Sequence, residues 1–186
     1  MPKVLVPLAQ GCEEVEAVTI IDLLRRAGIE VVSAGLDAQP VTASRGVRLI
    51  PDTTLDDALK QEFDMLVLPG GMPGAANLKN DLRIIVLLQN MARQDKYLCA
   101  ICAAPIVLAA AGLLDGKAAT GYPGFVDRMN LPGTTYRHAP VVRDGKIITS
   151  RGPGTAMDFA LELIEALAGT ARRNEVEAGL QRPGKY

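Results

Sequence analysis

Short apolar segments alternate along the chain with longer segments of helical periodicity, and this alternation is the feature that most constrains the fold. Residues 4–8, 65–68 and 98–101 are apolar throughout, whereas residues 14–27 and 82–93 repeat apolar side chains at helical spacing. Strands without a polar face are typical of parallel sheets that helices cover on both sides. The pattern therefore predicts an α/β fold, a three-layer sandwich with a mainly parallel central sheet.

Glycines mark the expected helix ends, and two segments look like antiparallel additions to the sheet. Gly28, Gly112 and Gly169 each follow a helical segment, where a left-handed residue commonly ends a helix. Residues 39–52 alternate loosely, and residues 141–149 carry an Asp-Gly turn between β-branched runs. We expect both segments to pair as antiparallel strands.

The length and composition fit one globular domain over residues 1–186, of which about residues 171–186 read as a polar C-terminal tail that packs or frays. The formal net charge of −1 leaves no basic excess, so nucleic acid is not expected as a primary partner. No apolar run approaches the roughly 18 residues of a membrane span, and the first residues lack the features of a secretory signal. We therefore expect a cytoplasmic protein without a membrane partner.

Three cysteines are an odd number for a disulfide framework, and Cys102 has the most informative position. It ends an apolar strand and precedes "AAP", whose small side chains and proline suit a tight turn into a helix. The positive end of a helix dipole would lower the pKa of a thiol placed there, which makes Cys102 a candidate nucleophile. The alternative is a buried cysteine acting as a small hydrophobic residue.

"PGGMPG", residues 69–74, follows another apolar strand and should lie at the same edge of the sheet as Cys102. Gly70 and Gly71 could present backbone N–H groups to a developing oxyanion. The alternative is a flexible turn. The glycine spacing does not match a dinucleotide-binding fingerprint.

"GCEEVEAV", residues 11–18, places three glutamates at the start of the first helix. The helix dipole is enough to explain Glu13 and Glu14, but it explains Glu16 less well. A carboxylate beside a thiolate would raise the pKa of both groups, so a low thiol pKa requires Glu16 to be protonated and hydrogen-bonded to sulfur.

Other reactive side chains are less informative. Cys99 and Cys102 have the spacing of a redox pair, but Cys99 should lie inside a strand, too far from Cys102 for an unstrained disulfide. Cys12 is either an accessory thiol or a small filler. His138 is the only histidine and is expected at the surface, so no metal site can be assembled and no cofactor is expected.

Six motifs in this order resemble the ThiJ/PfpI family: "GCEEVEAV", "RRAGIEV", "ASRGV", "DMLVLPGGMPGAANL", "AICAAP" and "SRGPGTAMDFALELIEAL". The similarity covers nearly the whole chain, and the branch that it most resembles is that of the bacterial chaperone YajL and a human parkinsonism-linked protein deglycase. The resemblance implies a flavodoxin-like fold and a homodimer.

The resemblance also implies roles for individual residues. Cys102 would be the reactive cysteine, Glu16 its acidic partner, and the amides of Gly71 and Ala103 the oxyanion donors. Arg45, Arg151 and Gly70 would lie near the site, with Arg45 and Arg151 at the site or at a dimer contact. Tyr122 stands where the human branch has a histidine, which puts a Cys-His dyad in doubt and weakens a peptidase assignment.

The activity implied is a cofactor-independent glyoxalase or deglycase acting on methylglyoxal or on its early protein and nucleotide adducts, with protection against oxidative stress. Cys102 would attack the aldehyde carbon and Glu16 would relay a proton between adjacent carbons. The alternatives are a redox sensor or stress-activated chaperone that works through oxidation of Cys102, and, behind these, a cysteine peptidase.

Overall fold

A computed structural model describes residues 1–183 and shows a seven-stranded sheet in the order β10-β11-β7-β6-β1-β2-β5. All neighbouring strands of this sheet are parallel except β10, which pairs antiparallel with β11. The strands of this sheet are β1 (Lys3–Leu8), β2 (Glu30–Gly35), β5 (Thr53–Thr54), β6 (Met65–Leu68), β7 (Tyr97–Ile101), β10 (Val141–Asp144) and β11 (Ile147–Ser150). The five longer parallel strands follow the flavodoxin-like order: β2 is added on one side of β1, and β6, β7 and β11 are added in turn on the other side.

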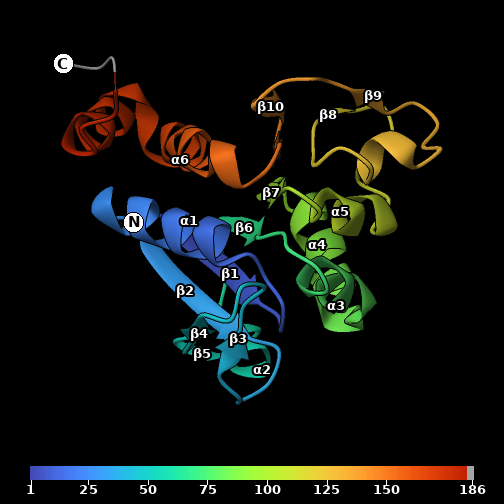
Figure 1. Ribbon diagram of the computed structural model, residues 1–186, viewed down its shortest axis with the longest axis horizontal. Helices are drawn as coiled ribbons and strands as arrows, with labels where there is room; N and C mark the ends of the chain where they lie inside the picture. The colour runs from blue at the N-terminus through green and yellow to red at the C-terminus, as the bar shows by residue number, and fades with distance from the viewer. Residues whose placement is uncertain (184–186) are drawn as a thin grey trace.

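Helices cover both faces of the sheet, which confirms the predicted three-layer sandwich (Figure 1). On one face lie α1 (Glu14–Arg26) and α6 (Ala156–Gly179). On the other face lie α3 (Gly74–Asn80), α4 (Leu82–Arg93) and α5 (Pro105–Ala110). Shorter elements complete the chain: α2 (Leu55–Ala58), β3 (Val41–Thr42), β4 (Arg48–Leu49), β8 (Ala118–Ala119), β9 (Thr135–Tyr136), and the 3-10 turns η1 (Val126–Arg128) and η2 (Pro153–Thr155).

The core lies where the apolar strands meet the helices. Every side chain of β6 is buried, as expected for a strand with helices on both sides. Phe159 of α6 and Leu88 of α4 are completely buried on opposite faces of the sheet. Burying one such side chain contributes about 1.5–3 kcal/mol, so this double packing is what holds the strand ends in fixed positions.

The predicted helix ends are confirmed at Gly28 and Gly112, which have φ angles of 73° and 76° just after α1 and α5. Gly169 is also left-handed, with φ 84°, but the helix resumes after it as the second part of α6. Residues 171–179, which we expected in a polar tail, are therefore helical, and Val176 is buried there. Residues 184–186 of that expected tail lie outside the described residues.

The two expected antiparallel additions have different outcomes. The Asp144-Gly145 turn joins β10 to β11 at the edge of the central sheet, as predicted. In contrast, β3 and β4 pair only with each other and form a separate two-stranded sheet, so their predicted addition to the central sheet is wrong. The sheet edge next to β2 is instead occupied by β5, which pairs parallel with β2.

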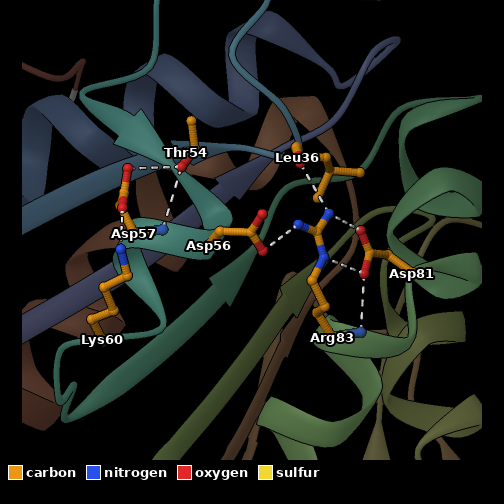
Figure 2. Close-up of polar contacts among 7 residues, drawn as sticks. All are labelled: Leu36, Thr54, Asp56, Asp57, Lys60, Asp81 and Arg83. Carbon is orange, nitrogen blue, oxygen red and sulfur yellow. Dashed lines mark hydrogen bonds and ion pairs between the residues drawn. The ribbon is translucent and has the colours of Figure 1, made fainter.

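Arg83 ties together three segments around the far end of β2 (Figure 2). Its guanidinium group bonds Asp81, which caps the start of α4, at 2.6 Å and Asp56 of α2 at 2.7 Å. It also donates to the carbonyl oxygen of Leu36, just after β2, at 2.9 Å. This cluster orders the loops beside β2.

Among residues 1–183, no helix is long and apolar enough to cross a membrane.

Candidate active site

Three loops meet at the carboxyl edge of the central sheet, because β1, β6 and β7 are neighbours and run parallel. Cys102 follows β7, Gly70 and Gly71 follow β6, and Glu13 lies between β1 and α1. Parallel strands end at the same edge, so residues far apart in the sequence come together there. The predicted juxtaposition of Cys102 with the glycine loop is confirmed.

The loops after β1 and β6 interlock through their backbones. The Glu13 N–H group donates to the Gly70 carbonyl oxygen at 2.9 Å, and the Gly74 N–H group donates to the Gly11 carbonyl oxygen at 3.2 Å. A Cβ atom at Gly71 would lie 2.4 Å from the Glu13 nitrogen, and Gly71 has a φ of 84°. Only glycine satisfies both the close approach and the left-handed backbone here.

Cys102 occupies a strained turn between β7 and α5. Its φ is 64°, a left-handed conformation that residues with a side chain adopt at a cost of about 1–3 kcal/mol. The Cys102 N–H group donates to the Ser150 carbonyl oxygen at 2.9 Å, which fixes the turn to β11. Ala104 precedes the helix and Pro105 is its first residue, so the predicted tight turn with proline in the first helical turn is confirmed.

Glu16 lies completely buried directly behind Cys102. Its Oε2 atom accepts a hydrogen bond from the Gly70 N–H group at 2.7 Å, and the same carboxyl group is hydrogen-bonded to the Cys102 thiol. Its Oε1 atom has no hydrogen-bond partner among residues 1–183. A Cβ atom at Gly70 would lie 2.6 Å from Cys102 Cβ and 2.8 Å from Glu16 Oε2. The absence of a side chain at Gly70 therefore allows the Glu16 carboxyl group and the Cys102 thiol to come into contact.

Burial controls the electrostatics of this pair. It raises the pKa of Glu16 to about 7, against the hydrogen bonds from Gly70 and Cys102 that lower it. Burial, together with the charge and hydrogen bond of Glu16, raises the pKa of Cys102 to about 12, whereas the N–H groups of Gly71 and Ala103 bond the sulfur and lower it. The expected low pKa of Cys102 is therefore wrong, because the thiol is only 8% exposed and faces a carboxylate.

The two groups titrate as one unit. Burial raises the pKa of both groups, and loss of a proton from one makes loss from the other harder, so the pair carries a single negative charge over a wide pH range. That charge rests on the carboxylate or, when the proton moves to Glu16, on the sulfur. One arrangement of the singly charged pair is therefore a thiolate beside a protonated Glu16, with two amides donating to the sulfur.

A cavity of about 270 Å³ opens in front of the thiol. Of the residues expected at the site, Cys102, Gly71, Ala103, Tyr122 and Arg45 line it. The other lining residues are Glu13, Ser44, Met72, Phe125 and Pro153. Hollows of about 350 and about 660 Å³ lie elsewhere on the surface, but neither is lined by a cysteine, so the smaller cavity is the candidate site.

Three expected site residues do not line the cavity. Glu16 and Gly70 lie beneath it, in contact with Cys102. Arg151 is also absent from the lining; its backbone N–H group donates to the Pro140 carbonyl oxygen at 3.1 Å, and Pro153 of the same segment reaches the cavity instead.

Glu13 and Ser44 are site residues that the sequence did not reveal. The Ser44 hydroxyl group lies 2.7 Å from Glu13 Oε2 and 3.0 Å from Glu14 Oε2, and Glu14 also accepts from the Arg45 N–H group at 2.9 Å. These bonds hold the loop after β3 against the start of α1. A helix dipole explains glutamates at this position well enough that no sequence signal separated Glu13 from Glu14.

The remaining reactive side chains lie outside the cavity. His138 is exposed and packs edge-on against Tyr136, with the ring centroids 5.1 Å apart. Cys12 and Cys99 are buried free cysteines, and burial raises the pKa of both. Within residues 1–183, no three His, Cys, Asp or Glu side chains are grouped so that they could hold a metal ion.

Known proteins are similar to this chain in sequence and in fold. Residues 2–166 match the model of the DJ-1/PfpI family. Over 182 residues the chain is 43% identical to the Parkinson disease protein 7 homolog of Danio rerio, covering 96% of each protein. Over 167 residues it is 36% identical to the glutathione-independent glyoxalase DJR-1.2 of Caenorhabditis elegans, covering 90% of this chain and 89% of that protein.

The structural similarity is equally close. The crystal structure of Drosophila melanogaster DJ-1beta has a TM-score of 0.92 and 43% sequence identity, and the match covers 96% of this chain and 97% of that one. This likeness confirms the flavodoxin-like fold. Some relatives are longer: the chain spans 45% of the length of protein DJ-1 homolog A of Arabidopsis thaliana, to which it is 41% identical.

Proposed function

The chain belongs to the DJ-1/PfpI family, and from that premise we propose that it is a cysteine-dependent glyoxalase or deglycase that needs no cofactor. Its substrates would be methylglyoxal or the early adducts of methylglyoxal on proteins and nucleotides. The observation that carries the proposal is Cys102, which meets a buried acid, two backbone donors and a small cavity at one point. The glyoxalase name of the Caenorhabditis elegans relative supports the same reaction class.

The proposed reaction begins with the singly charged pair. With the proton on Glu16, the Cys102 sulfur attacks the aldehyde carbon, a C–S bond forms, and the carbonyl electrons move to oxygen. The amides of Gly71 and Ala103, which donate to the sulfur in the free protein, lie beside the position of this alkoxide and would stabilise it.

The next steps need no external oxidant. The alkoxide takes the proton of Glu16, and a carboxyl group then removes the proton from the former aldehyde carbon. A proton is delivered to the neighbouring carbonyl carbon and the hydroxyl proton passes to that carbon's oxygen, so the first carbon is oxidised and the second is reduced. The product is a thioester of a 2-hydroxy acid. Water then breaks the C–S bond and releases lactate and the free thiol. The family resemblance gives the proton relay to Glu16.

The cavity fits a small carbonyl compound better than a peptide. Tyr122 replaces the expected histidine, and its ring packs edge-on against Phe125 at 6.2 Å between centroids. Peptide hydrolysis requires an acid that protonates a poor amine leaving group, and the only histidine, His138, is outside the cavity. Arg45 at the rim would attract the carboxylate that the reaction generates.

We also propose that the protein is a cytoplasmic homodimer. Exposed apolar side chains lie on α1, on the neighbouring α6 and around β4: Val15, Val18, Val47 and Met157 are each about half exposed. A second copy that covers these residues would remove them from water. A cytoplasmic location fits a protein that depends on a reduced thiol.

A redox sensor or stress-activated chaperone is the second candidate, favoured by the unpartnered Oε1 atom of Glu16. Peroxide would convert the Cys102 thiolate to a sulfenate and then, with a second peroxide, to a sulfinate, releasing water each time. A protonated Glu16 would donate to a sulfinate oxygen. Intact-mass spectra without a two-oxygen adduct after mild peroxide treatment would exclude this role.

The test of the enzyme is lactate formation from methylglyoxal by wild type and by Cys102→Ser. We expect turnover in the wild type and none above background in the variant. Cys12→Ala is the matched control, because Cys12 is buried outside the cavity. Turnover that survives in Cys102→Ser, or its absence from the wild type, would refute the proposal.

A further inference from the structure

The proton relay in the proposed reaction needs a carboxyl group that reaches the substrate, and Glu16 does not meet this requirement. Glu16 has no exposed surface and is not part of the cavity wall. Its Oε2 atom is held by the Gly70 N–H group, and its carboxyl group is hydrogen-bonded to Cys102, which does line the cavity. Glu16 can therefore exchange a proton with the sulfur, but a substrate in the cavity does not touch it.

Glu13 is the carboxyl group that lines the cavity together with Cys102. The Ser44 hydroxyl group lies 2.7 Å from its Oε2 atom and orients it. The Glu13 N–H group donates to the carbonyl oxygen of Gly70, in the glycine loop after β6 that also carries Gly71. Glu13 and the glycine loop after β6 are thus held together by their backbones. No sequence signal distinguishes Glu13 from Glu14, but of the two only Glu13 lines the cavity.

We propose that Glu13 is the catalytic acid-base of the reaction, which takes the proton from the aldehyde carbon and returns it to the neighbouring carbon. Glu16 is then a positioning residue that acts through Cys102 by holding the thiol proton. The inference rests on the proposed function and assigns its two proton transfers to two different carboxyl groups. Glu13 takes up one proton and gives one back, so it ends each cycle in its starting state.

This division explains why the site contains two glutamates so close together. The group that keeps the sulfur ionised has to retain its proton during the attack. The group that removes a proton from carbon in the later step has to be ionised and has to reach the substrate. A buried Glu16 and a Glu13 at the cavity wall provide one carboxyl group for each task.

The experiment compares Glu13→Gln with Glu16→Gln by two readouts, lactate formation from methylglyoxal and the pH dependence of Cys102 alkylation by iodoacetamide. We expect Glu13→Gln to lose turnover by about 100-fold or more while its alkylation profile stays like that of the wild type. Glu16→Gln should change the alkylation profile. Glu62→Gln, which removes an exposed carboxylate that does not line the cavity, should turn over within a few-fold of the wild type.

A further variant separates chemistry from packing. Glu13→Ala removes the carboxyl group and leaves space beside the thiol, so added formate should restore turnover in a concentration-dependent way. Wild-type turnover in Glu13→Gln, or a loss accompanied by the altered alkylation profile of Glu16→Gln, would overturn the inference. An inactive wild type would instead overturn the proposed function itself, and the two failures are therefore distinguishable.

Discussion

Replacing Glu16 with glutamine should make the free energy of unfolding less dependent on pH in the neutral range. Burial raises the pKa of Glu16 from 4.5 to about 7 in the folded protein, whereas the unfolded chain keeps the ordinary value. A group with a raised pKa stabilises the folded state fully only below its unfolded pKa. That contribution is lost as the pH rises through the folded pKa.

The size of the effect follows from the shift. Each pKa unit corresponds to about 1.4 kcal/mol, so ionising Glu16 in place costs the folded state about 3 kcal/mol when the titration is complete. Between about pH 5 and about pH 8 the wild type should lose about 2.5 kcal/mol from this group alone. Glutamine cannot ionise, so the variant should not show this loss.

Urea denaturation of wild type and Glu16→Gln at these two pH values measures the effect. The difference in unfolding free energy between the two proteins should shift by about 2.5 kcal/mol in favour of the variant at the higher pH. Comparing the shift, rather than either value alone, cancels any constant cost of placing an amide in the pocket. An equal difference at both pH values would refute the reasoning.

Glu14→Gln is the control for this measurement. Burial raises the pKa of Glu14, but hydrogen bonds from Ser44, Arg45 and Val47 outweigh it, so the pKa is lowered overall. The stabilisation by a group of this kind is present above its unfolded pKa and is lost only as the pH falls through the folded pKa. Its replacement should therefore change stability by almost the same amount at about pH 5 and at about pH 8.

Two further changes test how the scaffold supports the site. Arg83→Met leaves the mostly buried carboxylate of Asp81 without its guanidinium partner, so the free energy of unfolding measured in urea should fall by about 1–3 kcal/mol. The rate of Cys102 alkylation should stay unchanged, because Arg83 lies outside the cavity. A changed alkylation rate would contradict that separation. Cys102→Gly should be more stable than Cys102→Ala by about 1 kcal/mol, because φ at this position is 64°; a more stable alanine variant would show that the turn is unstrained.

The sequence predicts the sheet and the edge at which the site lies, because unbroken apolar runs leave few alternatives. Residues 65–68 and 98–101 had no polar face, so both had to be buried strands, and Gly70 and Cys102 followed directly at their ends. Short elements were less predictable. The pairing of β3 with β4 depends on a loop that Glu14 holds in place, which is a contact across 30 or more residues.

The pKa values of the site residues depend on how deeply each side chain is buried, and burial cannot be read from the sequence. A cysteine before a helix suggests a lowered pKa, but α5 begins only at Pro105 and the thiol is almost closed off from water. Glu13 escaped notice for a related reason. It differs from Glu14 in lining the cavity, and that cavity is formed by segments distant in the sequence, including Ser44, which is 31 residues away.

The close packing of the two glycine loops also determines how protons reach the reactive pair. Glu16 and Cys102 lie under Gly70, where not even a methyl group would fit, and Glu16 has no surface in contact with water. A proton that leaves the pair must therefore cross the cavity. Glu13 stands in the wall of that cavity, so a second carboxyl group lies beside the space through which the buried pair exchanges protons with solvent.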